Sequence, residues 1–383
     1  MELTRQQEEA RKLLYAAIRE GAMEFVLFGY AGTGKTTLIK FLVEAANGHV
    51  VVLALTNKAV RVLRDKGIDN AETIHRFLYP RVGQGICNCR GEDEEFVEFH
   101  AKTCPAIKPV FGTDPLMGED VIVPSLIIVD ECSMVPEKIA RDILDKGIPV
   151  LAVGDPFQLP PVEGKPYWTK PDYELTDIQR QAKDNPIIRL AHDVRMGRGL
   201  KAGRYGGTVV DARSLLRAGP DMEDWDQVLT FRHVTRCAYN GMYRKAMGFG
   251  DPYPMPGETI MMRSTHKTLG LANGDMFTVE STKTYGGSVE LRLQVPDEKP
   301  LAVAVWGLGF GDAEDWSKLT RMDFNMVKRF GRATFGYVIT THSAQGSEWD
   351  RVLIAKDNNR SPNWMYTALT RARERAYVCL GAD

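Results

Sequence analysis

Glycines, a lysine and threonines are spaced for phosphate binding in the stretch FGYAGTGKTTLIK, residues 28–40. Gly29, Gly32 and Gly34 let the backbone turn so that its N–H groups, together with the start of a following helix, face phosphate oxygens. Lys35 adds a positive charge for the outer phosphates, and the Thr36 hydroxyl can bind Mg²⁺. We therefore assign nucleotide binding to this loop, through Gly32, Thr33, Gly34, Lys35, Thr36 and Thr37.

Two adjacent acids, Asp130 and Glu131, follow the apolar run LIIV. Acids at the end of a buried strand are costly unless a metal ion or a reacting water uses them. Asp130 would hold Mg²⁺, directly or through water, and Glu131 would polarise the attacking water as general base. A helix cap is the alternative interpretation. The phosphate loop earlier in the chain favours the second half of a nucleotide hydrolysis site.

Gln158 lies in VGDPFQLPPV, residues 153–162, after the next apolar run. At the catalytic edge of a sheet, its amide could contact both the γ-phosphate and the attacking water. A proline-rich turn is the alternative. The combination of Asp155, Gln158 and paired prolines favours the catalytic interpretation.

Short apolar segments rich in β-branched residues alternate with helical patterns: EFVLFGY, HVVVLAL, SLIIVDE and IPVLAVGD. Such segments are typical of parallel strands buried on both faces. An open α/β sheet of this kind binds its ligand at the carboxyl ends of the strands. Thr4 is expected to cap a first helix, whose apolar face comprises Ala10, Leu13, Leu14, Ala17 and Ile18.

A second α/β unit is expected to begin near Tyr173 and to include QVLTFR and HVTRCAYNGMYRKAM. From residue 256 to about residue 306 the pattern changes to alternating residues with glycine turns. This pattern predicts a small β barrel inserted into the second unit. The α/β pattern returns in TFGYVITTHSAQG, DRVLIA and ERAYVCL, so the second unit is expected to be discontinuous.

The net charge, the lengths of the apolar runs and the cysteine content argue against several classes of protein. The formal net charge of -1 argues against coating nucleic acid through bulk positive charge, but allows a local basic channel. No run of 18 apolar residues exists and the N-terminus is polar, which argues against a membrane span or a signal peptide. Six cysteines without a secretion signal indicate reduced thiols. We expect a cytoplasmic protein without a membrane partner.

In chain order, these segments resemble the motifs of superfamily 1B helicases of the RecD-like, Dda-like branch, which move 5′ to 3′ along single-stranded DNA. The resemblance rests on LTRQQ, GYAGTGKTT, LALTNKAVRVL, ETIHRFL, IIVDECSM, GDPFQLPPV, ELTDIQRQ, VITTHSAQGSEWDRVLI and MYTALTRARERAYV. It implies an α/β fold with two RecA-like P-loop domains, at residues 1–78 plus 121–170 and residues 171–252 plus 331–383. A small insertion at 79–120 would stand on the first domain, and an SH3-like β barrel at 253–330 would interrupt the second.

The resemblance also implies roles for residues outside the phosphate loop. Gln7 would read adenine, although Thr4 and Gln7 also fit a capping box. Arg180 and Arg371 would be arginine fingers that stabilise charge on the transferring phosphoryl group. The alternative for both arginines is a solvated surface ion pair. Gly346 is assigned to ATP binding.

DNA contacts are expected from polar loops that hold phosphates, with aromatic rings against bases. The candidates are Thr56, Asn57 and Lys58 after the second strand, His75 in the TIH segment, and Thr341, His342 and Ser343 in the second domain. His75 and His342 have the alternative of structural histidines.

Four potential metal ligands cluster in the insertion: Cys87, Cys89, His100 and Cys104. If EEFVEFHAKTC is helical, its histidine and cysteine project from one face, and a hairpin with the first two thiols would complete a tetrahedral Zn²⁺ site. The single residue between Cys87 and Cys89 is tighter than the usual spacing, so reduced thiols in a loop are the alternative. In relatives this region forms the wedge that splits the duplex.

The resulting hypothesis is an ATP- and Mg²⁺-dependent DNA helicase that translocates 5′ to 3′ and separates duplex strands as a monomer. Its partners would be single-stranded DNA, tailed duplex DNA, and single-strand-binding, replication or repair proteins. The alternative is a single-stranded-DNA-stimulated ATPase that remodels nucleoprotein without unwinding by itself. A small-molecule kinase would not need GDPFQLPP, THSAQG or two distant arginines. An RNA substrate stays open because no pattern here reads a 2′-hydroxyl.

Overall fold

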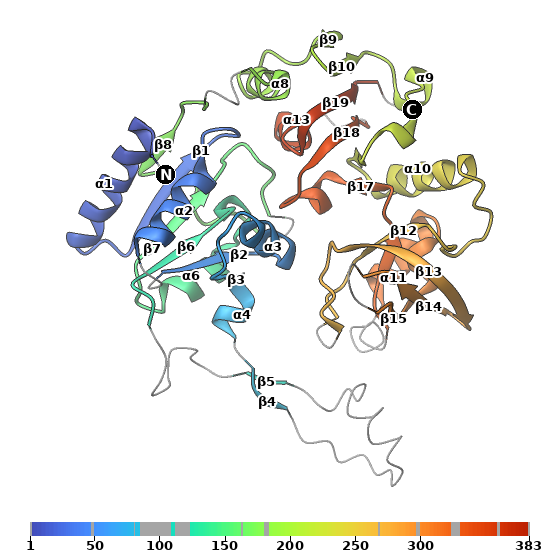
Figure 1. Cartoon of the computed structure of the whole chain (residues 1–383), viewed down its shortest axis with the longest axis horizontal. Helices are drawn as coiled ribbons and strands as arrows, with labels where there is room; N and C mark the ends of the chain where they lie inside the picture. Colours follow the sequence, from blue (N-terminus) through green and yellow to red (C-terminus); the bar gives the residue numbers. More distant parts are fainter. Residues whose placement is uncertain are drawn as a thin grey trace. The chain divides into compact units, whose positions relative to one another are not determined.

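The computed structural model describes residues 2–46, 50–79, 81–84, 109–111, 123–161, 164–179, 184–266, 269–295, 299–322, 330–357 and 361–381. The chain forms two compact units (Figure 1). Unit 1 comprises Met1–Pro80, Thr113–Asp226 and Ala344–Asp383, and unit 2 comprises Arg81–Gly112 and Gln227–Ser343. Within the described ranges, no helix is long and apolar enough to cross a membrane.

A parallel six-stranded sheet in unit 1 carries the phosphate loop. Its order is β3-β2-β6-β7-β1-β8, from β1 (Glu24–Gly29), β2 (Val50–Ala54), β3 (Ala71–Thr73), β6 (Leu126–Val129), β7 (Val150–Gly154) and β8 (Tyr173–Leu175). The four segments expected to be parallel strands are confirmed. Tyr173–Leu175, which we expected to open the second α/β unit, instead pairs with β1. A three-residue strand is too short for its sequence to show which sheet it joins.

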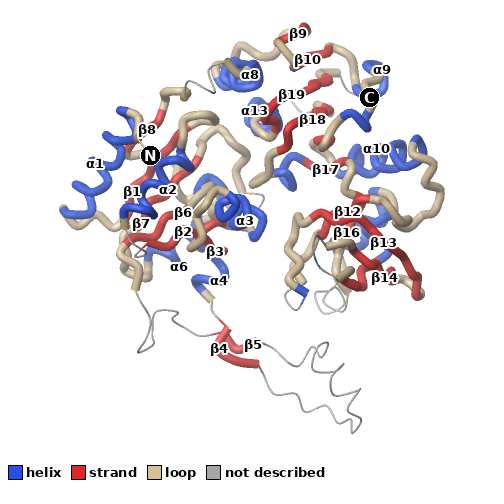
Figure 2. The backbone as a smooth tube through the Cα atoms, viewed as in Figure 1, coloured by secondary structure: helices blue, strands red, loops and turns tan. Residues whose placement is uncertain are grey.

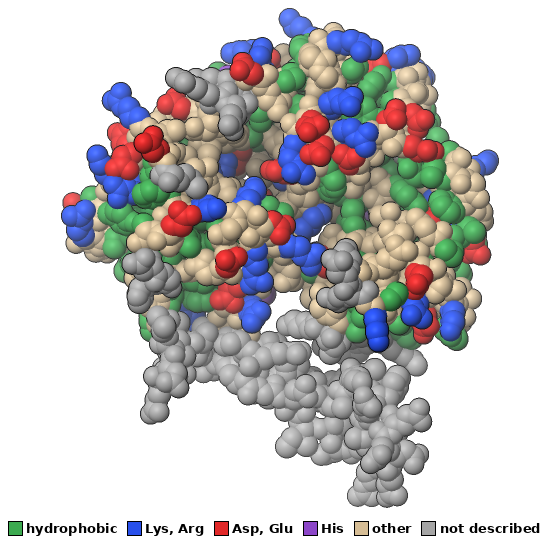
Figure 3. Space-filling view, in the orientation of Figure 1, with side chains coloured by type: hydrophobic (Ala, Val, Ile, Leu, Met, Phe, Trp, Pro, Cys, Tyr) green, Lys and Arg blue, Asp and Glu red, His purple; other side chains and the backbone are tan. Residues whose placement is uncertain are grey.

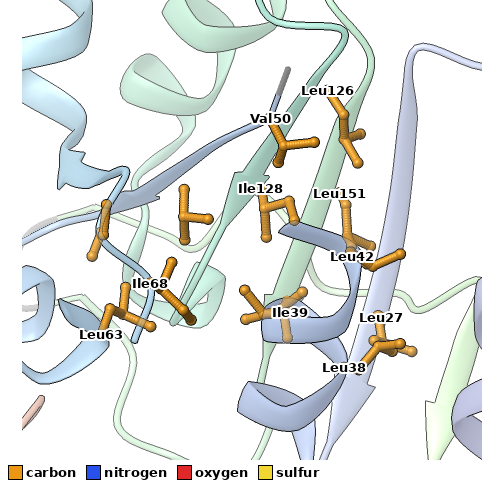
Figure 4. Close-up of a cluster of buried hydrophobic side chains, with 14 of the residues drawn as sticks. Leu27, Leu38, Ile39, Leu42, Val50, Leu63, Ile68, Leu126, Ile128 and Leu151 are labelled. Carbon is orange, nitrogen blue, oxygen red and sulfur yellow. The ribbon is translucent and has the colours of Figure 1, made fainter. Parts of the chain in front are cut away.

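Helices cover both faces of this sheet because successive strand residues point to opposite sides. On one face α1 (Arg5–Arg19), α2 (Lys35–Ala45) and α3 (Asn57–Asp65) form a core with the strands, and Figure 4 shows α2 leucines beside strand residues. On the other face lie α4 (Ile74–Leu78) and α6 (Glu137–Leu144). Each fully buried side chain, such as that of Leu42, contributes roughly 1.5–3 kcal/mol.

Helix α1 begins where its sequence predicts, after the Thr4 cap. Its buried stripe is Gln7, Ala10 and Leu14, an i, i+3, i+7 row. Leu13, which we expected on this face, is 42% exposed. The prediction for Leu13 was wrong because Leu13 lies beside the row of Gln7, Ala10 and Leu14. That single row of side chains is enough to cover the sheet.

The rest of unit 1 completes a second α/β element. Strands β18 (Trp349–Ala355), β19 (Ala372–Cys379) and β10 (Thr208–Asp211) run parallel, and β9 (Gly203–Tyr205) is antiparallel to β10. The helical segments are η1 (Cys132–Met134), α8 (Pro186–Arg195), α9 (Leu215–Ala218), η2 (Met222–Asp224) and α13 (Pro362–Leu369). Helix α13 lies against α8 and carries the segment MYTAL.

Unit 2 is dominated by an antiparallel sheet of order β15-β14-β13-β12-β16 (Figure 2). Its strands are β12 (Thr259–Met262), β13 (Met276–Tyr285), β14 (Ser288–Leu293), β15 (Leu301–Trp306) and β16 (Ala333–Phe335). The unit also holds the antiparallel pair β4 (Arg81–Gln84) and β5 (Pro109–Phe111), the parallel pair β11 (Gln227–Thr230) and β17 (Val338–Thr340), and α10 (His233–Ala246), η4 (Gly307–Phe310), α11 (Ala313–Arg321) and η5 (Thr341–Ala344). The expected series of short strands is therefore present.

Positive and negative side chains are interspersed on the face drawn in Figure 3, in keeping with the net charge of -1. No single-sign surface dominates that view. A nucleic acid would therefore have to be held by local clusters.

Candidate functional site

The phosphate loop has the backbone conformation that its glycines predict. Gly32 and Gly34 have φ of 79° and 82°, in the left-handed region. A Cβ on Gly34 would lie 2.5 Å from the amide nitrogen of Gln7, so only glycine fits there. Lys35 Nζ donates to the carbonyl oxygens of Gly29 (2.7 Å) and Tyr30 (3.1 Å). The loop thus joins β1 to the N-terminus of α2 with a tethered ammonium group beside it.

The threonines of this loop differ in their surroundings. Thr33 is buried, and its hydroxyl donates to the Tyr30 carbonyl at 2.8 Å. Thr36 and Thr37 lie in the first turn of α2 and are partly exposed. Their hydroxyls are therefore the ones that a ligand at this helix N-terminus can reach.

The acid pair follows β6 directly. Burial raises the pKa values of Asp130 and Glu131, while the charge of Lys35 lowers both. Glu131 also has φ of 53°, a left-handed conformation that a residue with a side chain adopts only at a cost. Both acids are partly exposed, so a divalent cation and a reacting water could reach this pair of partly desolvated carboxylates beside Lys35.

Arg371 follows α13 and is only 4% exposed. Its guanidinium donates to the Thr367 and Ser347 carbonyl oxygens and to the Thr370 hydroxyl, each at 3.2 Å. Its positive charge lowers the pKa of Glu131 against the larger effect of burial. The alternative of a solvated ion pair is therefore wrong for Arg371. Arg180 lies outside the described residues, so its role stays a prediction.

Helix α13 also holds the loop that follows β7. The Tyr366 hydroxyl donates to Asp155 Oδ2 at 2.6 Å and accepts the Ala31 N–H at 2.8 Å. The Thr367 hydroxyl accepts the Leu159 N–H at 3.0 Å. Tyr366 thus connects the Asp155 loop to the backbone of the phosphate loop.

Gln158 lies within this loop and is partly exposed. Its backbone N–H donates to the Asp155 carbonyl at 3.2 Å. Asn363 and Gln345 donate to the carbonyl oxygens of Phe157 (3.0 Å) and Leu159 (3.2 Å) on either side. Hydrogen bonds thus hold this loop on both sides of Gln158, and the catalytic role of the Gln158 amide stays a prediction.

Sequence reasoning missed Tyr366, Thr367 and Gln345. The available signal was a hydroxyl-bearing pair within the otherwise apolar helix MYTAL, five residues before Arg371. A buried tyrosine hydroxyl nearly always has a partner, so such a residue points to an interaction that the fold must supply.

Gln7 is 2% exposed and both ends of its amide are used. Its Oε1 accepts the Thr4 N–H at 2.8 Å, and its Nε2 donates to the Gly34 carbonyl at 2.9 Å. The Thr4–Gln7 capping box is thus present. Adenine reading by Gln7 stays a prediction. Gly346 lies near the start of α3, where a Cβ would be 3.3 Å from that of Ala59.

The polar residues of unit 1 that we assigned to DNA lie at two helix starts. Thr56 caps α3 by accepting the Ala59 N–H at 3.1 Å, and Asn57 is exposed. Lys58 Nζ lies 5.0 Å from the ring centroid of Trp349. His75 is exposed in the first turn of α4, with its ring centroid 6.2 Å from that of Tyr79, and both its DNA contact and the structural alternative stay predictions.

The corresponding loop of unit 2 is Thr341–Ser343. Thr341 is buried and its hydroxyl donates to the Thr230 carbonyl at 3.3 Å. Burial lowers the pKa of the half-buried His342. The Ser343 hydroxyl lies 2.8 Å from that of Thr340 and accepts a hydrogen bond from Arg263 Nη1 at 2.6 Å. Thr341 therefore shapes the loop, and His342 and Ser343 are its accessible polar groups.

The zinc hypothesis concerns Cys87, Cys89, His100 and Cys104, which all lie outside the described residues. Zinc and reduced thiols both stay open for them. In the part of the chain that the structure describes, no group of three or more His, Cys, Asp or Glu residues could hold a metal ion.

Comparisons with known proteins match most of the chain. A family model of the AAA domain matches residues 2–209, and one of the UvrD-like helicase C-terminal domain matches residues 335–379. The chain is 31% identical over 380 residues to the ATP-dependent RecD2 DNA helicase of Deinococcus radiodurans, covering 92% of this chain and 46% of the relative. It is 28% identical over 299 residues to the ATP-dependent DNA helicase dda of Enterobacteria phage T4, covering 68% and 61%. The chain thus spans between about half and three fifths of these relatives.

The crystal structure of the Pif1 helicase from Bacteroides, in complex with ADP-AlF3 and single-stranded DNA, has a similar fold. The TM-score is 0.52 at 17% sequence identity, over 98% of this chain and 92% of that one. The fold class of an α/β protein with parallel sheets, arranged as in this two-domain RecA-like structure, is confirmed at that level.

Proposed function

Because this chain belongs to the AAA domain family and to the superfamily 1B helicases of the RecD-like, Dda-like branch, we propose that it is an ATP-driven DNA helicase. It would translocate 5′ to 3′ on single-stranded DNA and separate duplex strands. The relatives named ATP-dependent DNA helicases support this activity.

The observation that carries the proposal is the buried Arg371, whose charge reaches Glu131 beside Lys35. In a hydrolysis step, Lys35 would hold the outer phosphates and Glu131 would take a proton from the attacking water. Arg371 would stabilise the charge on the transferring phosphoryl group, and Gln158 would orient the water. An isolated phosphate-binding loop would need neither the acid nor the arginine.

ATP and Mg²⁺ fit the residues present. The left-handed glycines at 32 and 34 leave a cradle of backbone N–H groups in front of α2, which suits a triphosphate. Thr36 and Asp130 would hold Mg²⁺, which would neutralise phosphate charge when bound. Gln7 and Gly346 would complete the nucleotide site.

Single-stranded DNA would be held by the polar loops containing Thr56, Asn57, Lys58 and His75 in unit 1, and by Thr341–Ser343 in unit 2. We assign residues 1–78 plus 121–175 to one RecA-like domain, because β8 joins its sheet, and residues 176–252 plus 331–383 to the other, with a wedge at 79–120. The antiparallel sheet β15-β14-β13-β12-β16 supports an SH3-like barrel at 253–330. The motor would work as a monomer, and single-strand-binding, replication or repair proteins would be its partners.

Strand separation on three partial duplexes tests the proposal, with a 5′ tail, a 3′ tail or no tail. ATP should drive unwinding from the 5′ tail alone, and Lys35→Ala should abolish it. ATP hydrolysis stimulated by single strands without unwinding would favour the nucleoprotein remodeller. No stimulation by single-stranded DNA would refute the motor altogether.

A further inference from the structure

Two arginines of unit 2 lie over one tryptophan ring, and a third arginine is the neighbour of one of them. Arg236 comes from α10, Arg263 follows β12, and Arg332 precedes β16. The guanidinium carbons of Arg236 and Arg263 lie 4.7 Å and 5.5 Å from the Trp316 ring centroid. The backbone N–H of Arg263 donates to the backbone carbonyl of Arg332 at 2.7 Å, and this bond holds the two residues side by side. We call Arg236, Arg263 and Arg332 the arginine cluster.

The cluster carries more positive charge than its surroundings balance. In each of its members Nε is buried without a hydrogen-bond partner. Arg236 is 2% exposed and donates to the hydroxyl of Thr334 and the sulfur of Cys237. Among the described residues, no carboxylate forms an ion pair with any of the three arginines. Unpaired buried charge is costly unless a ligand of opposite charge completes the site.

The charges of Arg236 and Arg332 lie close enough to Arg263 to repel its guanidinium group. Burial and the charges of Arg236 and Arg332 lower the pKa of Arg263 to about 10. At neutral pH the Arg263 guanidinium still carries its charge. An anion placed among them would relieve both the desolvation and the repulsion.

Two members of the cluster are less buried than Arg236. Arg263 and Arg332 are partly exposed, as are His342 and Ser343. Arg263 Nη1 donates to the Ser343 hydroxyl, so the cluster borders the Thr341–Ser343 loop. A ligand at this loop would meet the outer two arginines first and Arg236 behind them.

We propose that the arginine cluster binds a phosphate group next to the Thr341–Ser343 loop. The group is either a phosphodiester of a bound single strand or a free phosphate ion. The strand form rests on the proposed function. Guanidinium forks match the oxygen spacing of a phosphate and bind it bidentately, which a set of neutral donors would not do. The Arg263 guanidinium would then donate hydrogen bonds both to the Ser343 hydroxyl and to the phosphate group.

Salt dependence of oligo-dT binding tests the strand form. Arg263→Gln should weaken binding roughly tenfold or more, since a hydrogen bond to a charged group is lost. It should also reduce the slope of log K against log salt by about 0.7, the contribution of one phosphate on a single strand. Arg332→Gln should act alike. The hydrogen bonds that Arg332 makes with Ser264 and Arg263 come from its backbone, so this change leaves them in place.

Arg292→Gln is the matched control, because Arg292 lies in the same unit in an exposed ion pair with Glu280. It should leave both affinity and slope close to wild type. An equal loss in Arg292→Gln would overturn the proposal, because the effect would then be one of net charge.

Free phosphate is tested in Lys35→Ala protein, so that the phosphate loop does not contribute. Phosphate should raise the thermal unfolding midpoint of Lys35→Ala above that in chloride of equal ionic strength, and this rise should vanish in Lys35→Ala with Arg263→Gln. A thermal effect without a change in salt slope assigns the site to free phosphate. If neither readout depends on Arg263 or Arg332, the cluster is structural and the proposal fails. If wild type binds no single strand, the motor fails while the thermal arm still decides the cluster.

Discussion

The hydroxyl of Tyr366 lies 2.6 Å from Asp155 Oδ2 and accepts the backbone N–H of Ala31 at 2.8 Å. One buried oxygen atom therefore joins the loop after β7 to the phosphate loop after β1. Burial, followed by the charge of Asp155, raises the pKa of this tyrosine far above its ordinary value, so the hydroxyl stays protonated and keeps donating.

Tyr366→Phe should break this connection while keeping the ring that packs on Phe157. Two buried polar groups lose a partner, so the free energy of unfolding should fall by about 1–3 kcal/mol. ATP turnover should fall as well, because the Asp155 loop carries Gln158. Tyr285→Phe, at an exposed position of β13, should change neither. Urea denaturation and steady-state ATPase rates measure both effects. Wild-type turnover in Tyr366→Phe would mean that the bridge only stabilises.

Arg371→Ala should lower the turnover number by roughly 10³-fold or more, the usual effect of losing an arginine finger. Arg373→Ala is the control, since Arg373 lies two residues further on in an exposed ion pair with Asp350. Removing Arg371 should also raise the pKa of Glu131, because its charge lowers that pKa. The acidic limb of the residual pH–rate profile should therefore move to higher pH. An unmoved limb would separate Arg371 from the general base.

The backbone conformation of Glu131 should lower the stability of the protein, while its carboxylate is needed for hydrolysis. Glu131→Gln keeps the side chain at φ of 53° and should abolish hydrolysis while nucleotide still binds. Glu131→Gly should also be inactive, yet more stable than Glu131→Gln by about 1 kcal/mol, because glycine adopts this conformation without strain. Equilibrium unfolding of the two variants measures the difference. Equal stability would show that the strain is already relieved by its surroundings.

Acid should destabilise the protein through His233. Desolvation of its ring against Trp316, and then the charges of Arg236 and Arg263, lower its pKa from 6.5 to about 4. Its contribution is therefore fully present above pH 6.5 and is lost as the pH falls toward 4, because the unfolded chain binds the proton first. In His233→Gln the loss of stability between pH 7 and pH 5 should be smaller, and His75→Gln should match wild type. Parallel pH profiles for all three proteins would contradict this assignment.

Gln7 should serve nucleotide selection and helix capping separately. Thr4→Ala removes the cap and should cost about 1 kcal/mol of stability without changing the preference for ATP over GTP. Gln7→Glu keeps an acceptor for the Thr4 N–H but loses the donor to Gly34, and should raise the KM for ATP and weaken that preference. Steady-state rates with both nucleotides measure this. If selectivity survives in Gln7→Glu, capping is the whole role of Gln7.

Local patterns determined much of the first sheet and its phosphate loop. The runs EFVLFG and LIIV can only be buried strands, and GTGKT places left-handed glycines before a helix. The order of motifs was also enough to identify the family. The face of α1 was predicted less well, because the number of apolar rows that a helix buries depends on the partner it covers, and Leu13 is left outside.

Contacts distant in sequence were decided by the tertiary structure alone. Tyr366 and Asp155 are separated by 211 residues, and the sequence around either residue does not indicate that the two are in contact. The same holds for Arg236 and Arg263, which come from separate segments and meet at Trp316. The spacing of residues in a sequence shows which chemical groups lie along one strand or one helix. Packing of the segments decides which charged groups are buried next to one another. Those contacts in turn decide which pKa values shift and which sites need an anion.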